Sequence, residues 1–499
     1  PRRRDGPVKV LFVYPEFPDT YWSFRHALRF YGKRSAFPPL GLLTVSALLP
    51  ASWERRLVDL NVRPLADAEI KWADLVLISA MLVQKESLRR VVARSKALGK
   101  RVVVGGPYVT TLAEPMAGVD HLFLGEAEST LPELVADLQR GEAKPVYQAV
   151  ERPSLALSPV PHFHLASLGH YLEMSVQYSR GCPFQCEFCD IIEIYGRVPR
   201  TKSNEQLLTE LDELLRLGWR GHVFIVDDNF IGNKRDVKRL LPALAEWSER
   251  HRHPFTFLTE ASVNLADDDE LLDMMRRARF RSVFLGIETP VQESLQETLK
   301  HQNIRRNLVD AVRKIQGYGL DVMAGFIVGF DNDPDDIFQQ QIDFIRESAI
   351  PLAMVGLLQA LPGTALWRRL EHEGRLLSEG TGHLECSLTF IPKMDRVRLL
   401  EGYRTIVQTV YAPHEYYGRT LDCLSRLAKR LPVQRRATPF DDLVALGRVL
   451  VTLGVRDDAR GEFWKFCRSV LADHRDQFEL AMRLAAIGYH LRTVAKTST

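Results

Sequence analysis

Short runs of apolar, β-branched residues alternate with helix-like segments along most of this chain, and this alternation limits the fold more than any other feature. Between residues 8 and 140 the runs are VKVLFVYP, RRLVDLN, ADLVLISA, KRVVVGGP and DHLFLGEAE. Helical patterns such as PLGLLTVSALLP and KESLRRVVARSKALG separate them. Strands that alternate with helices form βα units around a parallel sheet. We therefore predict a Rossmann-like, doubly wound α/β domain of five strands, with a ligand site outside the carboxyl ends of the strands.

A second series of βα repeats follows the first. Its strand candidates are EMSVQYS, HVFIVDD, FTFLTEAS, SVFLGIET, VMAGFIVGF and LAMVGLLQAL, with helical patterns between successive members. Six such repeats are typical of a partial (β/α)6 barrel, in which binding and catalytic residues lie at the carboxyl ends of the strands.

A proline-rich segment joins the two series, and a helical region follows the second. Residues 151–168 read ERPSLALSPVPHFHLASL and predict an extended linker. Beyond residue 375 the segments DDLVALGRVLVTLGV and QFELAMRLAAIGYHLRTVAK carry apolar residues at helical spacing. The expected division is a Rossmann-like domain at 1–150, a linker at 151–168, a barrel at 169–375 and a helical domain at 376–499.

The composition and charge of the chain argue against several classes of protein. The chain has 66 lysines and arginines against 63 aspartates and glutamates, so it lacks a basic excess, and no nucleic-acid partner is expected. No apolar stretch approaches the roughly 18 residues of a transmembrane helix, and the basic N-terminus lacks a signal-peptide core. Cys386, Cys423 and Cys467 are scattered like ordinary buried thiols, with no disulfide framework. A cytoplasmic location fits this pattern best.

The other three cysteines form a CxxxCxxC motif in SRGCPFQCEFCD, after the first strand of the second series. Cys182, Cys186 and Cys189 supply three ligands where a structural zinc site needs four, and no histidine follows closely. Disulfides are not expected from three cysteines in a reducing compartment, and inert core thiols would not need a loop bracketed by Gly181 and Pro183. The motif indicates an iron–sulfur cluster held by three thiolates, with one iron open to a non-protein ligand.

The motif, its place after the first barrel strand and the aromatic Phe188 before its last cysteine resemble the radical S-adenosylmethionine (SAM) superfamily. In that superfamily three cysteines bind a [4Fe-4S] cluster, and the amino and carboxylate groups of SAM chelate the remaining iron. One electron then cleaves SAM to methionine and a 5′-deoxyadenosyl radical, which abstracts a substrate hydrogen atom. The resemblance implies a [4Fe-4S] cluster and SAM as cofactors, and an electron donor such as flavodoxin or ferredoxin as a partner.

The ends of the other barrel strands carry the kinds of group that a SAM site needs. The resemblance implies that Glu260 binds the ribose hydroxyls and that 325–329, with Gly325 and Val328, lies against the adenine. Tyr195 and Arg197 follow the cysteine loop and are candidate catalytic residues, although both could simply pack this loop. Further cofactor-binding candidates are Phe188, Asp227, Asp228 and Glu288. Each acid could instead form a salt bridge or a helix cap inside the barrel.

The first domain lacks the GxGxxG fingerprint after its first strand, where the chain reads VYPEFPDT, and this counts against NAD and FAD. With the barrel behind it, the domain resembles the cobalamin-binding radical SAM family, in which a B12 ring stacks over the barrel mouth. The likeness rests on FPPLGLLTVSALLP, SAMLVQ, GGPYVT and LGEAE. The implied cobalamin-binding residues are Ser79, Met81, Gln84, Gly105, Gly106, Pro107, Tyr108, Gly125 and Glu126.

One feature departs from many B12 domains, which ligate cobalt through the histidine of a DxHxxG motif. Here Asp120 and His121 precede Gly125 with the wrong spacing, at the start of a strand. Radical SAM relatives generally lack this histidine too, so the resemblance implies base-off cobalamin with no protein histidine on cobalt. The aromatic-rich segment 19–37 could cover the cobalamin or the substrate, and its basic residues could equally form a solvated face.

Further strings, including CDIIEIYGRVPRTKS, VDDNFIGN, GIETP, GFIVGFDNDP and ALPGT, resemble the subgroup that includes hopanoid C-2 methylases and has a helical C-terminal domain of unknown function. The resemblance implies methylation of an unactivated sp3 carbon. One SAM would form methylcobalamin, a second would yield the 5′-deoxyadenosyl radical, and the substrate radical would take the methyl group.

Two other functions stay open. One is a cobalamin-dependent radical SAM oxidase or cyclase without methyl transfer, and the other is a non-catalytic iron–sulfur sensor or scaffold. The expected partner is a small-molecule substrate, apolar or polycyclic. Amphipathic C-terminal helices would also suit peripheral contact with a membrane, although any packed helical domain has such helices.

Overall fold

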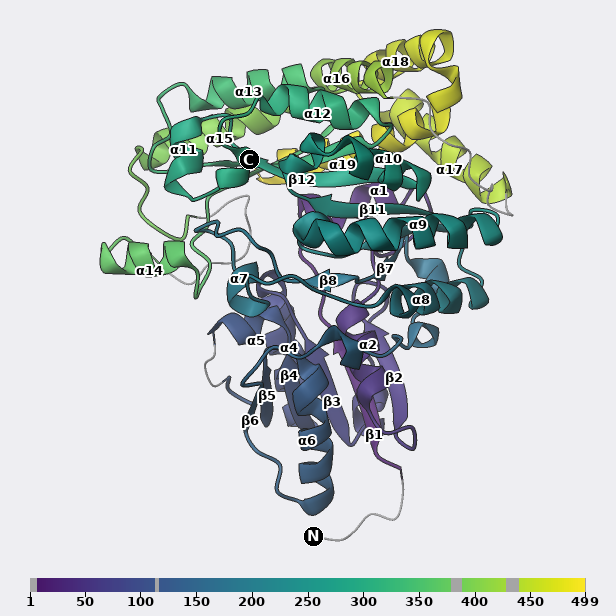
Figure 1. The fold of residues 1–499 in the computed structure, drawn as a ribbon, viewed down its shortest axis with the longest axis vertical. Coiled ribbons are helices and arrows are strands. Elements are labelled where there is room, and N and C mark those ends of the chain that lie inside the picture. The colour runs from purple at the N-terminus through teal and green to yellow at the C-terminus, as the bar shows by residue number, and fades with distance from the viewer. Residues whose placement is uncertain (1–6, 113–115, 378–387, 428–438, 499) are drawn as a thin grey trace.

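A computed structural model of the chain describes residues 7–112, 116–377, 388–427 and 439–498 (Figure 1). The main parts of the described structure are two six-stranded parallel sheets, each with its connecting helices, and a C-terminal group of helices. The predicted fold class is confirmed: a Rossmann-like α/β region, a partial barrel and a helical region follow one another along the chain. Of the three scattered cysteines, Cys423 and Cys467 are buried, and Cys386 lies outside the described residues.

The first sheet has the strand order β2-β1-β3-β4-β5-β6. Because the order reverses at β1, the carboxyl ends of β1 and β3 flank the point where such sheets bind ligands. The strands are β1 (Lys9–Tyr14), β2 (Glu54–Asp59), β3 (Leu75–Ser79), β4 (Arg101–Gly105), β5 (His121–Leu124) and β6 (Val146–Gln148). The helices are α2 (Leu40–Leu48), α3 (Asp67–Trp72), α4 (Lys85–Ala97), α5 (Pro107–Leu112) and α6 (Ala127–Arg140). We predicted five strands; the sixth, β6, spans only three residues at the sheet edge, too few to show a pattern.

Apolar residues fill both faces of this sheet, which is why its strands read as continuous apolar runs rather than alternating ones. On β1, Val10 and Phe12 pack into one core, and Leu11 and Val13 pack into another on the opposite face. After β6 the proline-rich segment forms three short 3-10 turns, η3 (Leu155–Leu157), η4 (Phe163–Leu165) and η5 (Leu168–His170).

The second sheet has the strand order β14-β13-β12-β11-β10-β7, so it is an open partial barrel with β7 and β14 at its edges. All six strand candidates form strands in this sheet. They are β7 (Met174–Val176), β10 (Gly221–Ile225), β11 (Phe255–Ala261), β12 (Phe280–Glu288), β13 (Asp321–Val328) and β14 (Leu352–Leu357). The helices between them are α7 (Ile191–Ile194), α8 (Asn204–Arg216), α9 (Lys234–Arg250), α10 (Asp269–Arg277), α11 (Gln292–Glu297), α12 (Leu308–Gly317) and α13 (Ile337–Ser348).

The C-terminal region is helical and packs against the barrel and the N-terminal segment (Figure 1). Its helices are α14 (Ala365–His372), α15 (Arg396–Val410), α16 (Pro413–Arg426), α17 (Pro439–Val451), α18 (Arg460–Asp473) and α19 (Phe478–Ser498). The segment η1 (Tyr21–Ser23) and α1 (Arg25–Leu28) lies against α19, where His490 Nε2 is 3.0 Å from the Tyr21 carbonyl oxygen. Among the described residues, none of the helices combines the length and the apolar composition needed to cross a membrane.

Candidate active site

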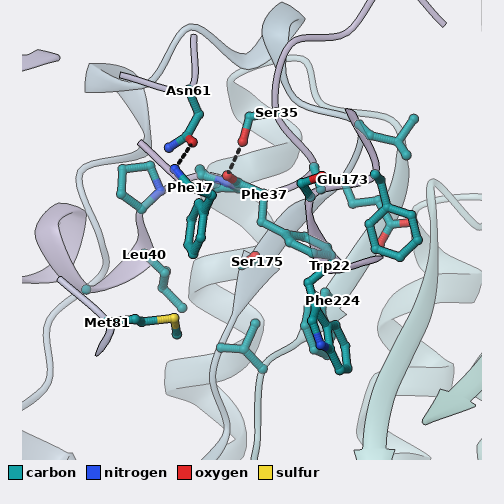
Figure 2. Close-up of a pocket in the computed structure, with 18 of the residues that line it drawn as sticks. Phe17, Trp22, Ser35, Phe37, Leu40, Asn61, Met81, Glu173, Ser175 and Phe224 are labelled. Atoms are coloured by element: carbon teal, nitrogen blue, oxygen red, sulfur yellow. Dashed lines mark hydrogen bonds between the residues drawn. The ribbon is translucent and has the colours of Figure 1, made fainter. Parts of the chain in front are cut away.

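A cavity of about 1490 Å³ lies between the two sheets. Loops at the carboxyl ends of both sheets line it, and so does the aromatic-rich segment 19–37 (Figure 2). Trp22 packs on Phe284 of β12 with ring centroids 5.1 Å apart, and Phe37 packs on Phe224 of β10 at the same distance. The N-terminal segment therefore forms a wall of the cavity, as one of its two sequence interpretations expected.

Most of the residues proposed to bind cobalamin lie at this cavity. Those that line it are Ser79, Met81, Gly105, Gly106, Pro107, Tyr108, Gly125 and Glu126. Gln84 does not: its amide nitrogen donates to the Pro15 carbonyl oxygen at 2.6 Å, and its amide oxygen accepts from the Met81 N–H at 2.9 Å. Gln84 therefore holds the SAMLVQ loop in shape and leaves Met81, which is 48% exposed, facing the cavity.

Two glycines make the wall of the first domain smooth. Gly106 has φ +98°, and a Cβ there would stand 2.6 Å from Ser79 Oγ and 2.9 Å from the Ala80 carbonyl oxygen. The loops after β3 and β4 can therefore pack together only around a glycine. Gly125, with φ +86°, has no atom within 4 Å of the position that a Cβ would take. Glycine backbone that lies close to the cavity surface leaves room for a large macrocycle such as cobalamin. His121 lies away from this wall, with Nδ1 2.5 Å from the Lys144 carbonyl oxygen.

Glu126 connects the first domain to the cysteine loop. Its carboxylate accepts from Arg180 at 2.6 Å and from Arg200 at 2.6 Å, and its neighbour Glu128 accepts from Arg180 at 2.7 Å. Arg180 is two positions before Cys182, and both acids are almost fully buried. Glu126 lines the cavity, but Arg180 and Arg200 already neutralise its charge.

The cysteine loop is closed at its base by a short hairpin that the sequence did not predict. β8 (Ser179–Arg180) pairs antiparallel with β9 (Arg200–Thr201). Gly181, with φ +97°, turns the chain at a point where a Cβ would meet the Gly196 carbonyl oxygen at 2.8 Å. The Cys182 N–H donates to that same oxygen at 3.1 Å. The loop needs glycine at this position for steric reasons.

The three thiols lie in a setting that suits thiolates bound to metal. Asn229 Nδ2 donates to Cys182 Sγ at 3.7 Å, and Gln302 Nε2 donates to Cys186 Sγ at 3.6 Å. Burial raises the pKa of Cys182 and of Cys189, and the neighbouring thiols raise both further. Three neighbouring thiolates, with Cys186 buried and Cys182 and Cys189 partly buried, need a bound cation to be stable, and metal would provide it.

The chemistry of the donor set fits an iron–sulfur cluster. Three thiols come from one loop, and the sulfurs of Cys182 and Cys186 accept N–H groups from Asn229 and Gln302. Among the described residues, no three His, Cys, Asp or Glu side chains are close enough to hold one metal ion.

Lys300 is a site residue that the sequence did not reveal. Its buried ammonium group pairs with Glu288 and lies 5.7 Å from the centre of the Phe188 ring. Burial lowers the pKa of Lys300, but Glu288 and Cys186 outweigh this effect and raise it overall. Lys300 therefore puts a positive charge beside the thiols. The stretch TLKHQN carries no motif that could have identified it.

Asp228 and Glu260 line the cavity on the barrel side. Burial raises the pKa of Asp228 to about 7, with a further contribution from the charges of Asp227 and Asp190. Burial raises the pKa of Glu260 to about 8, with a further contribution from the charges of Asp228 and Asp227. Among the described residues, Asp228 Oδ2 has no hydrogen-bond partner. Asp227 points elsewhere: it accepts from the backbone N–H groups of Tyr178 and Ser179, each at 2.8 Å. Asp228 and Glu260 are thus available for polar groups of a bound molecule, whereas Asp227 fixes the entry to the cysteine loop.

The remaining candidates divide between the cavity and the surrounding structure. Tyr195 lines the cavity, whereas Arg197 is exposed and donates to the Pro183 carbonyl oxygen at 3.3 Å. Phe188 packs on Phe330, outside the cavity lining. Arg197 therefore occupies the loop-packing position that was its alternative interpretation.

The prediction for β13 is corrected in one respect. Side chains alternate along a strand, and Asp321 and Met323 face the cavity, so Val328 lies on the opposite side, buried in the core beneath the helices. Gly325 lies on the same side of β13 as Asp321 and Met323, and a Cβ there would stand 3.3 Å from the Phe284 ring. Only the backbone of Val328 could approach a ligand.

Three families match successive parts of the chain. A B12 binding domain matches residues 34–135, the radical SAM superfamily matches residues 176–345, and a domain of unknown function (DUF4070) matches residues 364–499. These matches follow the same order as the two sheets and the C-terminal helices.

Among the relatives that match nearly the whole chain, two have high sequence identity. An uncharacterized methyltransferase from Synechocystis sp. is 46% identical over 488 residues, which cover 97% of this chain and 91% of the relative. The hopanoid C-2 methylase of Rhodopseudomonas palustris is 34% identical over 508 aligned positions, which cover 98% of this chain and 94% of the relative.

Two solved structures share the fold. The cobalamin-dependent SAM radical enzyme OxsB with aqua-cobalamin bound matches with a TM-score of 0.63 at 16% identity, over 99% of this chain and 81% of OxsB. The radical SAM methyltransferase TsrM from Kitasatospora setae matches with a TM-score of 0.62 at 14% identity, over 93% of this chain and 99% of TsrM.

Proposed function

This chain belongs to the cobalamin-binding radical SAM methyltransferases, and from this premise we propose that it methylates an unactivated sp3 carbon of an apolar small molecule. Its cofactors are a [4Fe-4S] cluster, SAM and cobalamin. When bound, the cluster supplies the electron for radical formation and cobalamin supplies a transferable methyl group.

The observation that carries this proposal is one cavity that residues of both sheets line together. The SAMLVQ and GGP loops line one side, and Tyr195, Asp228 and Glu260 line the other. A methyl donor and a radical site must both reach the same substrate carbon, and one shared chamber allows this. Walls on several sides also limit the access of solvent to a reactive carbon radical.

We assign roles to the residues that line or border this chamber. Cys182, Cys186 and Cys189 would hold the cluster, with Asn229 and Gln302 donating hydrogen bonds to two of the sulfurs. Asp228 and Glu260 would accept hydrogen bonds from hydroxyl or amino groups of SAM, and Lys300 would add positive charge near the cluster. Tyr195 remains the candidate that could contact the substrate or donate a hydrogen atom to it.

The first domain would hold cobalamin. Gly106 and Gly125 provide the close backbone approach, and Met81 provides apolar contact beneath the ring. We expect no histidine on cobalt, because His121 is held away from the cavity by the Lys144 carbonyl. We divide the chain into a cobalamin-binding domain at 1–150, a linker at 151–168, the radical SAM barrel at 169–375 and a helical domain at 376–499.

Apolar groups dominate the rest of the cavity wall. Phe224, Phe284 and Met323 come from the barrel, and Leu446 and Met482 come from α17 and α19. This lining favours an apolar substrate, and a polycyclic one would fill it with little loss of conformational entropy. An apolar substrate dissolved in lipid would require peripheral contact with a membrane. We also propose a flavodoxin- or ferredoxin-like electron donor and a reducing, cytoplasmic setting.

The experiment that tests this function uses SAM with a deuterated methyl group. Reconstituted enzyme is incubated anaerobically with reductant and a lipid extract, and products are analysed by mass spectrometry. A product that carries the deuterated methyl group supports methyl transfer. An oxidase or cyclase would give a changed but unlabelled product. A sensor or scaffold would release no 5′-deoxyadenosine after reduction with dithionite and would keep its function in a Cys186→Ala variant.

A further inference from the structure

The cavity continues through the barrel toward the amino ends of its strands, and its chemistry changes with depth. Every second residue of a strand faces the same side. From the amino to the carboxyl end, Thr256, Leu258 and Glu260 of β11 line the cavity in turn. On β10 and the residues after it, His222, Phe224 and Asp228 show the same order. The cavity therefore has a polar floor, an apolar middle and an acidic mouth beside the cysteine loop.

The floor is a connected group of polar side chains, here called the floor cluster: His222, Thr256, Ser282, Asp321 and Arg483. His222 Nδ1 lies 2.6 Å from Thr256 Oγ1, and Ser282 Oγ donates to Asp321 Oδ1 at 2.5 Å. Arg483 of α19 joins the two pairs, with one nitrogen 3.4 Å from His222 Nε2 and another 3.4 Å from Asp321 Oδ2. Four neighbouring strands and the C-terminal helix thus build one polar surface.

Arg483 can donate further hydrogen bonds to a molecule in the cavity. A guanidinium carries five N–H donors, and the two contacts found for Arg483 are both at 3.4 Å, near the upper limit for a hydrogen bond. Its side chain is 25% exposed and lines the cavity. A bound group of suitable geometry would meet a charged donor there.

The charges around the floor indicate which kind of chemical group of a ligand would bind there. Arg281 and Arg483 bring two positive charges to the lining near the floor. Four acids bring negative charges: Asp321, Glu479, Asp442 of α17 and Glu173, which directly precedes β7. A carboxylate or a phosphate would gain no net attraction from this balance. A hydroxyl fits better, because it can donate to Asp321 and accept from Arg483 or Thr256.

The middle of the cavity sets the minimum length of the occupant. Thr256 and Glu260 are four residues apart on β11, a distance of about 13 Å at the usual rise of a strand. Most side chains between the floor and the mouth are apolar, including Phe224, Leu258 and Phe284, and Ser175 of β7 is a polar exception opposite Phe224. A molecule that reaches from the mouth to the floor must have an apolar body of about this length.

We propose that the floor cluster is a binding subsite for the hydroxyl end of an elongated apolar substrate, whose opposite end places the reacting carbon at the mouth. This rests on the proposed function, since that function places the chemistry at the mouth. The subsite lets a reaction at an unactivated carbon be selective, because the enzyme recognises the substrate at an end remote from the reacting carbon.

The test compares 1-dodecanol with dodecane as probes of the cofactor-loaded enzyme, with free probe measured by headspace gas chromatography. We expect the alcohol to bind at least about tenfold more tightly than the alkane, the size of a hydrogen bond to a charged group. Arg483→Met should bring this ratio to within about twofold and leave alkane binding unchanged. Thr256→Val removes only a hydroxyl and should lower the ratio severalfold. Arg475→Met, at an exposed position before α19, is the matched control.

A ratio near one in the unmodified enzyme overturns the subsite, as does a ratio that neither variant changes. If Arg483→Met fails to fold, Thr256→Val decides the question alone. The same preparations are assayed for cobalamin retention and for release of 5′-deoxyadenosine. Normal retention and release with no alcohol preference reject the subsite only, whereas failure to retain cobalamin rejects the proposed function.

Discussion

Arg180 of the cysteine hairpin donates a 2.6 Å hydrogen bond to Glu126 of the first domain, and both side chains are nearly buried. Because Arg180 also pairs with Glu128, one arginine ties the loop after β5 to the loop that begins at Cys182. The wall assigned to cobalamin and the loop assigned to the cluster are thus held in register by one buried ion-pair network.

Loss of Arg180 should destabilise the protein strongly. Arg180→Met leaves the buried Glu128 without its arginine partner and Glu126 with Arg200 alone. We expect it to lower the free energy of unfolding by about 3–5 kcal/mol. Chemical denaturation measures this. Arg197→Met, at an exposed position of the same loop, should change the free energy of unfolding by no more than about 0.5 kcal/mol. Equal stability of the two variants would show that the network does not bind the domains together.

The amides that contact the cysteine sulfurs should tune the cluster without being needed to bind it. Gln302→Leu removes the N–H donor to Cys186 Sγ and should keep the absorbance of the cluster. A hydrogen bond of about 1 kcal/mol corresponds to roughly 40 mV for one electron, so the reduction potential should become more negative by about that amount. Redox titration followed by electron paramagnetic resonance measures the shift. An unchanged potential would show that Gln302 does not contact the reduced cluster.

Gly106 should be essential for retaining cobalamin. Gly106→Ala forces a Cβ to within 2.6 Å of Ser79 Oγ at a φ of +98°, so the loops after β3 and β4 must separate. We expect the variant to fold but to lose most of its cobalamin on desalting. Gly169→Ala, where no atom lies within 4 Å of the added Cβ, is the control and should retain cobalamin. Full retention by Gly106→Ala would place the cobalamin elsewhere.

Glu260 should make the cofactor-free protein less stable as the pH rises. Burial raises the pKa of Glu260 to about 8 from an ordinary value of 4.5. The folded state therefore holds a proton that the unfolded state releases, and stability is lost as the pH rises through this window, by at most about 1.4 kcal/mol per pH unit. Glu260→Gln should flatten the dependence of thermal stability on pH between 5 and 8. Glu246→Gln, an exposed acid on α9, should leave it unchanged. A slope that Glu260→Gln does not alter would mean that Glu260 is ionised when buried.

The sequence predicted the parts of the site that depend on local pattern. Asp228 and Glu260 directly follow or end apolar strand runs, and the carboxyl ends of parallel strands meet at one edge, so their convergence was foreseeable. The same holds for Cys182, Cys186 and Cys189, whose spacing carries the chemistry. For Val328 the strand was predicted correctly, but the direction of the side chain was not. That direction depends on which alternate residues of the strand face the cavity, and the sequence alone did not show this.

Residues that act through distant partners could not be found in this way. Lys300 approaches the thiols only because the segment after α11 folds over the barrel mouth. Arg483 meets Asp321 across 162 positions of the chain. Gln84 looked like a ligand because it stands in the SAMLVQ loop, but its hydrogen bonds to Pro15 and Met81 turn it away from the cavity. No pattern in one sequence records such long-range packing.

We propose that one chamber serves both a cluster and a cobalamin for methyl transfer. Anaerobic reconstitution with iron, sulfide and hydroxocobalamin tests this, followed by desalting, ultraviolet–visible spectroscopy, and incubation with reductant and SAM. We expect one cluster and one cobalamin per chain, with both 5′-deoxyadenosine and S-adenosylhomocysteine formed. Loss of cobalamin on desalting, or 5′-deoxyadenosine without S-adenosylhomocysteine from cobalamin-loaded enzyme, would show that the chamber does not transfer a methyl group from cobalamin.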